Sequence, residues 1–170
     1  MKKTGILFVL ALLVGSFTTA FAQNASPKMT AEGKNVKVVY GQPSKKGRTI
    51  FGADGSGSLE SYGKVWRTGA NEATEITFKK DGMFGGKPIK AGTYTLFTVP
   101  GEKEWKIILN SELKQWGAYG YDKVKDKNVL EVTVPTKKYK DSAEKLMFDV
   151  KDNALAFQWD TMGFEVPMKF

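Results

Sequence analysis

The sequence lacks two residue types on which many exported and catalytic proteins depend, because none of its 170 residues is cysteine or histidine. Without cysteine the chain forms no disulfide, so a folded domain must draw its stability from a hydrophobic core. Without histidine it cannot build a Ser-His-Asp or Cys-His catalytic site, nor a zinc or copper site ligated by histidine. We expect no metal site and no cofactor, and any catalysis must use Asp, Glu, Lys, Arg, Tyr or Ser.

Long apolar runs are also scarce, and the longest lies near the start of the chain. Lys2 and Lys3 precede the apolar stretch Ile6–Phe17, and Ala20-Phe21-Ala22 follows it. This order is typical of a secretory signal peptide, whereas a membrane-spanning helix needs about 20 apolar residues. We expect residues 1–22 to be a signal peptide cleaved after Ala22. The remaining chain is then exported, to the periplasm or the extracellular space, with no membrane span.

Basic residues outnumber acidic ones, 26 to 18, but the excess charge is dispersed. It lies in short pairs such as Lys45-Lys46, Lys79-Lys80 and Lys137-Lys138, and no block of five like charges occurs. Electrostatic binding of nucleic acid uses clustered basic residues, so this spacing indicates no nucleic-acid partner. The sequence leaves the oligomeric state open.

Apolar residues recur mostly with the two-residue period of β-strands. A polar leader at residues 23–35 is followed by short alternating strands, separated by glycine- and proline-containing turns. One helical turn is expected at Ser111–Gln115. Nine or ten short strands with little helix predict an all-β fold, an antiparallel β-sandwich that is jelly-roll-like or similar, forming a single domain over residues 36–170. The side chains expected in its core are Trp66, Phe78, Leu96, Trp105, Ile107, Leu146, Phe148 and Trp159.

The densest group of polar side chains lies in the segment Trp66–Thr74, between two predicted strands. Loops on a rigid β scaffold commonly carry binding groups, so Arg67, Thr68, Asn71 and Glu72 are candidate ligand contacts. The structural alternative is a stabilising turn, in which Arg67 pairs with Glu72 and Asn71 adopts a left-handed conformation.

A second candidate is the aromatic loop Gln115–Asp122, which holds Trp116, Tyr119 and Tyr121 beside glycines. Aromatic rings near amides and carboxylates are the groups that sugar-binding sites use, because the C–H face of a sugar stacks on a ring. The alternative is that these rings cover the end of the core. We expect this loop and the Trp66–Thr74 segment to lie at the same end of the sandwich and to line one shallow cleft.

Paired carboxylates are the remaining possibility for catalysis. Glycosidases without histidine use two of them, held roughly 5 or 9 Å apart according to mechanism. Glu72 is the first candidate for such a role and Asp122 a distant second.

Four runs of the sequence resemble the bacterial family called domain of unknown function 2911. The similarity extends over about residues 36–168, and the strings WRTGANEAT and GTYTLFTVPG are its most distinctive part. The resemblance implies a compact exported β domain and no activity. The glycine-rich stretch Ala53–Ser58 departs from the pattern. The four runs are YGQPSKKGRTIFG, YGKVWRTGANEATEITF, AGTYTLFTVPGEKEWKIILN and QWGAYGYD.

Three hypotheses about function follow. The favoured one is a non-catalytic binding module of the cell envelope, with a glycan or another small envelope molecule as ligand. The second is a histidine-free, carboxylate-dependent glycoside hydrolase. The third is a structural or protein-interaction subunit, which would present an exposed apolar patch or an unpaired sheet edge.

Overall fold

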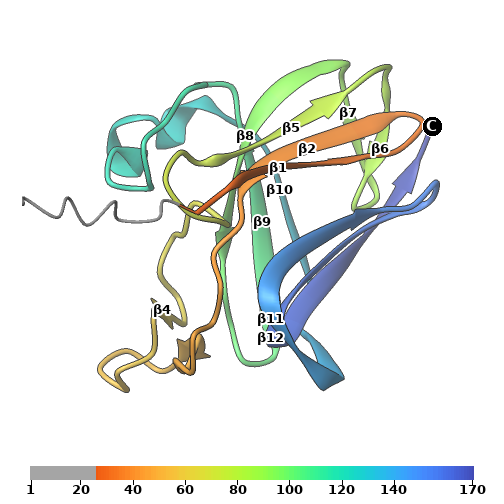
Figure 1. Cartoon of the computed structure of the whole chain (residues 1–170). Helices are drawn as coiled ribbons and strands as arrows, with labels where there is room; N and C mark the ends of the chain where they lie inside the picture. Colours follow the sequence, from red (N-terminus) through yellow and green to blue (C-terminus); the bar gives the residue numbers. More distant parts are fainter. Residues whose placement is uncertain (1–25) are drawn as a thin grey trace, which may run out of the picture.

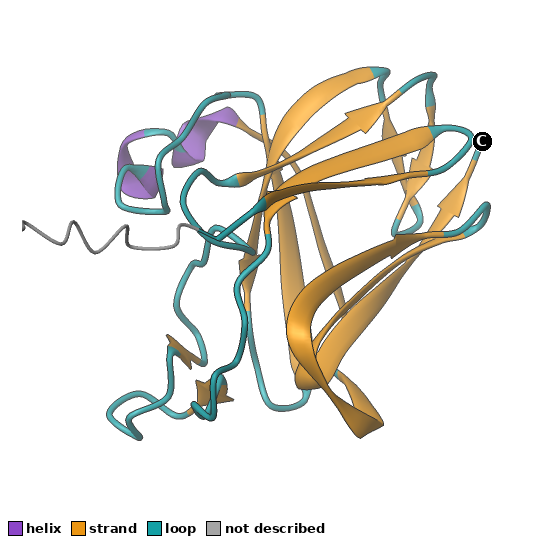
Figure 2. Cartoon of the chain, in the orientation of Figure 1, coloured by secondary structure: helices purple, strands orange, loops and turns teal. Residues whose placement is uncertain are grey.

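The computed structural model describes residues 26–170 and consists almost entirely of β-strands (Figures 1 and 2). The expected signal peptide, residues 1–22, lies outside the described residues. The larger sheet is antiparallel and contains, in spatial order, β1 (Lys28–Glu32), β2 (Val36–Gly41), β5 (Thr74–Phe78), β8 (Gly92–Val99), β9 (Glu104–Asn110) and β10 (Asn128–Pro135). The smaller antiparallel sheet contains β11 (Lys137–Val150), β12 (Ala154–Lys169), β6 (Gly82–Phe84) and β7 (Lys87–Ile89).

The two sheets face each other, so the predicted all-β sandwich is confirmed (Figure 1). Strands of the larger sheet follow one another in chain order, with two excursions. One excursion carries a short parallel pair, β3 (Phe51–Gly52) and β4 (Glu60–Ser61), and the other carries β6 and β7. The topology is therefore an interrupted meander rather than a jelly roll.

The expected strand lengths and boundaries differ from the observed ones in two places. Residues 26–170 contain twelve strands rather than nine or ten. The sheet begins inside the expected leader, because Lys28–Glu32 pairs with β2 as an edge strand whose side chains are mostly exposed and polar. At the other end, β11 and β12 are 14 and 16 residues long, and register shifts and a positive φ at Asp160 bend this hairpin.

The helical turn expected at Ser111–Gln115 is wrong. Asn110 forms a turn without a helix, because its side-chain oxygen accepts a hydrogen bond from the Glu112 amide (2.8 Å). Lys114, however, has a φ of 57°, which is incompatible with a continuing helix. The helical turns come later, as the short 3-10 helices η1 (Tyr121–Lys123) and η2 (Lys125–Lys127).

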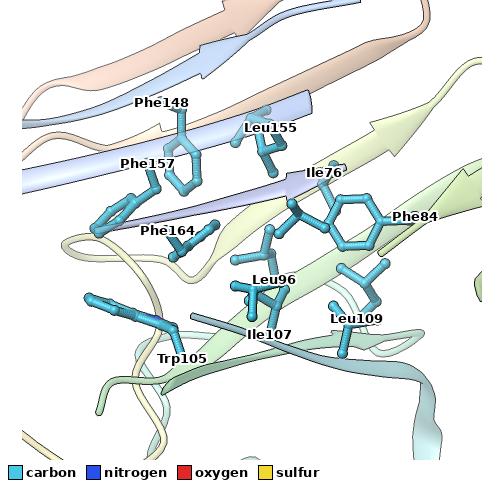
Figure 3. Close-up of a cluster of buried hydrophobic side chains, with 14 of the residues drawn as sticks. Ile76, Phe84, Leu96, Trp105, Ile107, Leu109, Phe148, Leu155, Phe157 and Phe164 are labelled. Atoms are coloured by element: carbon cyan, nitrogen blue, oxygen red, sulfur yellow. The ribbon is translucent and has the colours of Figure 1, made fainter. Parts of the chain in front are cut away.

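The core lies between the two sheets and is rich in aromatic rings (Figure 3). All eight side chains expected in the core are buried. Trp66 stacks on Trp159 with 6.0 Å between ring centroids, and Phe51 packs edge-on against Trp105 at 5.0 Å. Trp66 and Phe51 belong to the long segment that carries β3 and β4 at the lower left of Figure 1, so this segment is anchored to the core by its aromatic residues.

The end of β2 touches the connection that leads into β5. The Gly41 carbonyl accepts a hydrogen bond from the Ala70 amide (3.2 Å), and a Cβ atom on Gly41 would lie 2.0 Å from the Ala70 carbonyl oxygen. Because both groups are backbone, neither can move aside without shifting its strand or loop. Gly41 therefore fixes how closely the 66–73 connection approaches the larger sheet.

We predict that Gly41→Ala lowers the free energy of unfolding by about 2 kcal/mol or more, since overpacking against fixed backbone strains the fold. Gly120→Ala is the matched control, because Gly120 has a φ of −92° and its added Cβ would meet only the end of the Gln115 side chain at 3.4 Å. Urea denaturation of both variants measures the difference. Equal stability of the two variants would contradict the close approach at Gly41.

Candidate functional site

The connection from β4 to β5 is held rigidly by backbone and hydroxyl contacts. Trp66 forms a two-bond antiparallel bridge with Thr98 of β8. Thr68 is fully buried with a φ of 56°, and its hydroxyl lies 3.0 Å from the Thr98 hydroxyl. The Thr68 carbonyl in turn accepts a hydrogen bond from the Thr74 hydroxyl (2.9 Å). A left-handed conformation at a β-branched residue costs free energy, so these contacts determine the path of the connection.

Asn71 also has a left-handed conformation, with a φ of 63°, as the turn interpretation predicts. Its side-chain amide donates a hydrogen bond to the Ser26 carbonyl (3.1 Å). The other part of that interpretation, an Arg67–Glu72 ion pair, is not formed. Glu72 instead lies 3.6 Å from the Lys28 amine of β1.

The segment 111–127, between β9 and β10, folds back onto the outer face of the larger sheet. Asn110 is fully buried and donates hydrogen bonds to the Val124 carbonyl (2.7 Å) and to the Asn128 side chain (2.8 Å). The Thr95 hydroxyl of β8 donates to the Glu112 carbonyl (2.6 Å). These contacts hold both ends of the segment, which carries the two 3-10 helices at the upper left of Figure 1.

A small second core fixes the middle of the segment. Ala73, Phe97 and Ile108 form this buried cluster, and Ala118 and Tyr121 pack against it. The Tyr121 ring meets Phe97 edge-on at 5.2 Å, and its hydroxyl accepts a hydrogen bond from the Asn128 side chain (2.7 Å). Tyr121 therefore has the structural role of the alternative interpretation, since it anchors the loop to the sheet.

The two candidate segments are joined directly by their backbones. The Ala73 amide donates to the Gln115 carbonyl (2.8 Å), and the Gly117 amide donates to the Asn71 carbonyl (3.1 Å). These two bonds make Glu72 and Trp116 an antiparallel bridge. The expected juxtaposition of the two segments is therefore observed, as a hydrogen-bonded pair packed on the larger sheet.

Two aromatic rings project from this pair into solvent. Trp116 is 65 % exposed and Tyr119 is 85 % exposed, and these are the two most exposed large apolar side chains among the described residues. The other three tryptophans, Trp66, Trp105 and Trp159, are buried. Exposed rings on a backbone that is held in place are available for contact with a ligand.

Two hollows lie beside the hydrogen-bonded segments 66–73 and 111–127. The first, of about 490 Å³, is lined by Glu72, Lys28 and Lys114 among others. The second, of about 410 Å³, is lined by residues of both segments together with the start of β4. The side chains that line this second hollow are Leu59, Glu60, Val65, Trp66, Arg67, Ala118 and Tyr119.

The second hollow contains Arg67 and a carboxyl group, that of Glu60, whose pKa is raised. Burial raises the pKa of Glu60 to about 7, although the nearby guanidinium groups of Arg67 and Arg48 act to lower it. The Glu60 carboxylate makes no hydrogen bond or ion pair with any residue in the described part of the chain. The Nε of Arg67 is buried and has no hydrogen-bond partner there either. A carboxyl group with a pKa near neutrality in a cleft is a common feature of functional sites.

The predicted single cleft is thus divided. Arg67 and Tyr119 line one hollow, Glu72 lines the other, and Trp116 stands between the segments without lining either. Thr68 is fully buried, with its hydroxyl directed to protein atoms, so it supports the site rather than facing a ligand.

Sequence reasoning missed Glu60 and Lys28. Glu60 follows a stretch rich in glycine and serine, and nothing in that stretch indicates a carboxyl that shares a hollow with an arginine and a tryptophan. The sequence pattern places Lys28 in the polar leader, residues 23–35. Its position opposite Glu72 depends on the pairing of β1 with β2, in which Lys28 lies across from Gly41.

Comparison with known proteins adds a family to this geometry. A family model described as "Protein of unknown function (DUF2911)" matches residues 22–168. The chain belongs to this family. No curated protein and no solved structure is significantly similar to it. The DUF2911 description carries no function, so any functional conclusion for this member must come from the site itself.

Two further findings concern metal ligation and membrane-spanning helices in the described residues. Within residues 26–170, no group of three or more acidic side chains is arranged to hold a metal ion. None of the helices in the same range is long and apolar enough to cross a membrane. The side chains that line the two hollows of this DUF2911 chain include carboxylates, a guanidinium, lysines and aromatic rings.

We predict that Glu60→Gln makes the fold less sensitive to pH. Because the pKa of Glu60 is about 7 in the folded protein and 4.5 for an ordinary glutamate, its contribution to stability is complete below pH 4.5 and is lost as the pH rises through 7. The variant should therefore gain about 2 to 3 kcal/mol relative to the wild type between pH 4.5 and pH 8. Urea denaturation at several pH values measures this gain.

Glu72→Gln is the control for this experiment, since its ion pair with Lys28 is exposed and should contribute less than about 1 kcal/mol. If Glu60→Gln followed the wild-type pH dependence, the burial of a titrating carboxyl at Glu60 would be wrong.

Proposed function

We propose that this protein is an exported binding module of the cell envelope, and that it binds a glycan at the paired loops 66–73 and 111–127. The observation that carries the proposal is the pair of exposed rings, Trp116 and Tyr119, on a backbone fixed by hydrogen bonds to the neighbouring loop. Rings held in this way contact a sugar face without first losing conformational freedom, which favours affinity. Polar groups beside aromatic walls are the usual composition of a small-ligand site.

The polar groups beside the rings suit hydroxyl-rich ligands. Glu72 and Lys28 line one hollow beside the loop pair, and Arg67 and Glu60 line the other. Carboxylates accept hydrogen bonds from sugar hydroxyls, whereas the amine and the guanidinium donate to sugar oxygens. A ligand that crosses the Glu72–Trp116 bridge would meet all four groups.

The hydrolase alternative receives less support from the geometry. It requires two carboxylates on either side of a scissile bond, with Glu72 as the first candidate and Asp122 as the second. Glu72 lines the hollow that contains Lys28, whereas Asp122 lies exposed in η1 and lines neither of the two hollows. Screening chromogenic glycosides between pH 4 and pH 8 tests this alternative. Turnover that Glu72→Gln abolishes would establish it in place of the binding function.

The structural-subunit alternative also has limited support. One of the two edge strands of the larger sheet is β1. It carries charged side chains such as Lys28 and Glu32, and Glu32 is paired with Lys79 at 2.7 Å. Charged residues on an edge strand are typical of sheets that avoid pairing with another chain.

We predict that Trp116→Ala lowers the affinity for the bound glycan by tenfold or more, because an exposed ring at the centre of a contact surface carries much of the binding energy. Isothermal titration calorimetry against a panel of soluble oligosaccharides and peptidoglycan fragments measures the affinity. Trp116→Phe retains a ring and should retain most of the binding. Met147→Ala, an exposed apolar residue on the smaller sheet, should leave it unchanged.

Intrinsic fluorescence gives a second measurement on the wild type, because Trp116 is the one exposed tryptophan of four. Binding at the loop pair should change its emission while the three buried tryptophans remain constant. No saturable binding across the whole panel would exclude the glycan-binding function.

A further inference from the structure

The hollow beside β4 contains a guanidinium that the described residues do not neutralise. Arg67 forms no ion pair with any of them, and its buried Nε has no hydrogen-bond partner. A buried donor without a partner costs about 1–3 kcal/mol, so such a group is usually satisfied by water or by a ligand. The Trp66 indole N–H, which belongs to the same lining, is also buried without a partner, so Arg67 is the charged one of two unpartnered donors there.

The one carboxyl group near Arg67 does not satisfy its guanidinium. Glu60 lines the same hollow, yet no ion pair forms between them, and the Glu60 carboxylate accepts no hydrogen bond from the described residues, since the Ser58 hydroxyl donates to its backbone carbonyl instead. Arg48, the other cation that acts on Glu60, is already engaged, since it donates to the Ser44 carbonyl (2.7 Å) and to the Lys45 carbonyl (3.0 Å). Because Nε itself is buried, the outer guanidinium nitrogens of Arg67 are the donors left to meet an anion that enters from solvent.

The walls of the hollow are suited to a ring. Trp66 and Val65 contribute apolar atoms to its lining, and the exposed ring of Tyr119 lines it as well. The volume, about 410 Å³, lies within the range of roughly 300–1,000 Å³ that is usual for small-molecule sites. An occupant should therefore combine an anionic group for Arg67 with a flat face for Tyr119.

From these observations we propose that the hollow binds the carboxylate of an acidic sugar, with the Arg67 guanidinium as its anchor. This inference rests on the proposed glycan-binding function and specifies its ligand class as uronic-acid glycans. A guanidinium presents two parallel N–H donors that match a carboxylate. Below pH 7, where Glu60 is mostly neutral, Arg67 is the one charged side chain among the residues that line the hollow, which suits a singly charged ligand.

Glu60 makes this binding depend on pH. The charged groups that act on it are Arg67 and Arg48, and Tyr119 is the other titratable side chain that lines the hollow. When Glu60 is neutral, it can donate a hydrogen bond to the ligand and Arg67 keeps its full attraction for an anion. When Glu60 is ionised, it repels a ligand carboxylate and competes for Arg67. Acidic sugars should therefore bind more tightly below pH 7 than above it.

The test is calorimetric titration with galacturonate oligomers and with galactose oligomers of equal length, at pH 5.5 and pH 8.5. At pH 5.5 the acidic oligomer should bind at least tenfold more tightly than the neutral one. Arg67→Gln should abolish this preference, and Arg67→Lys should weaken it, because lysine keeps the charge but loses the paired donors. Glu60→Gln should make the affinity at pH 8.5 equal to that at pH 5.5.

Three results would overturn the proposal, and each is distinguishable from failure of the glycan-binding function. Equal binding of acidic and neutral oligomers, with loss in Trp116→Ala, would reject the carboxylate site but keep the glycan function. Tighter binding of inorganic phosphate than of galacturonate would assign the hollow to phosphate. Binding of benzoate that Arg67→Gln abolishes, together with no saturable binding of any oligosaccharide, would reject the glycan function while keeping a carboxylate site.

The measurement does not depend on one variant. Thermal unfolding of Arg67→Gln shows whether the variant is folded. If it is not, the wild-type pH dependence and the Arg67 Nε–H resonance in a galacturonate titration still decide the proposal. An Nε–H resonance that does not move while the oligomer saturates the protein would reject Arg67 as the anchor.

Discussion

The backbone bridge between Glu72 and Trp116 is the interaction on which the candidate site depends. Its two hydrogen bonds join segments that are about forty residues apart in the chain, and neither Glu72 nor Trp116 belongs to the core of the sandwich. Closing a loop of this length costs conformational entropy, which the second cluster around Phe97 and Ile108 offsets by burying apolar surface. Once the bridge forms, it fixes the backbone that carries Trp116 and Tyr119, and Arg67 and Tyr119 then line the same hollow.

The sandwich supplies the rigid support for this bridge. Trp66 is stacked on Trp159 in the core and hydrogen-bonded to Thr98 of β8, so the connection leaves the sheet at a fixed point. Gly41 then permits the connection to pass within hydrogen-bonding distance of β2. The left-handed conformations of Thr68 and Asn71 turn it back toward the outer face of the larger sheet. Packing and local strain together place the functional groups.

Several parts of this arrangement follow from the sequence. The strand period identifies the inward residues, so the aromatic core around Trp105 and Trp159 is predictable without a structure. The left-handed turn at Asn71 is also predictable, because asparagine tolerates that conformation better than most residues. The proximity of the two loops is predicted only by their shared polar and aromatic composition, because no local pattern specifies the contact between them.

Other parts depend on tertiary contacts that no local pattern shows. The pKa of Glu60 reflects burial against the Trp66–Arg67 segment, and a Ser-Leu-Glu-Ser string gives no sign of this. The edge strand β1 is polar and mostly exposed, so it lacks the alternation that identifies buried strands. The composition of the aromatic loop Gln115–Asp122 predicts a position at one end of the sandwich, whereas the packing of the whole segment 111–127 on the outer face depends on the buried side chain of Asn110.

Amide hydrogen exchange at Ala73 and Gly117 tests the bridge most directly, since these two N–H groups make its hydrogen bonds. If the loops are held together before any ligand binds, both amides should exchange with protection comparable to that of paired amides in β8 and β9. The exposed amides of the Ala53–Ser58 loop provide the unprotected reference. Exchange of Ala73 and Gly117 at the rate of that loop would contradict a preformed site.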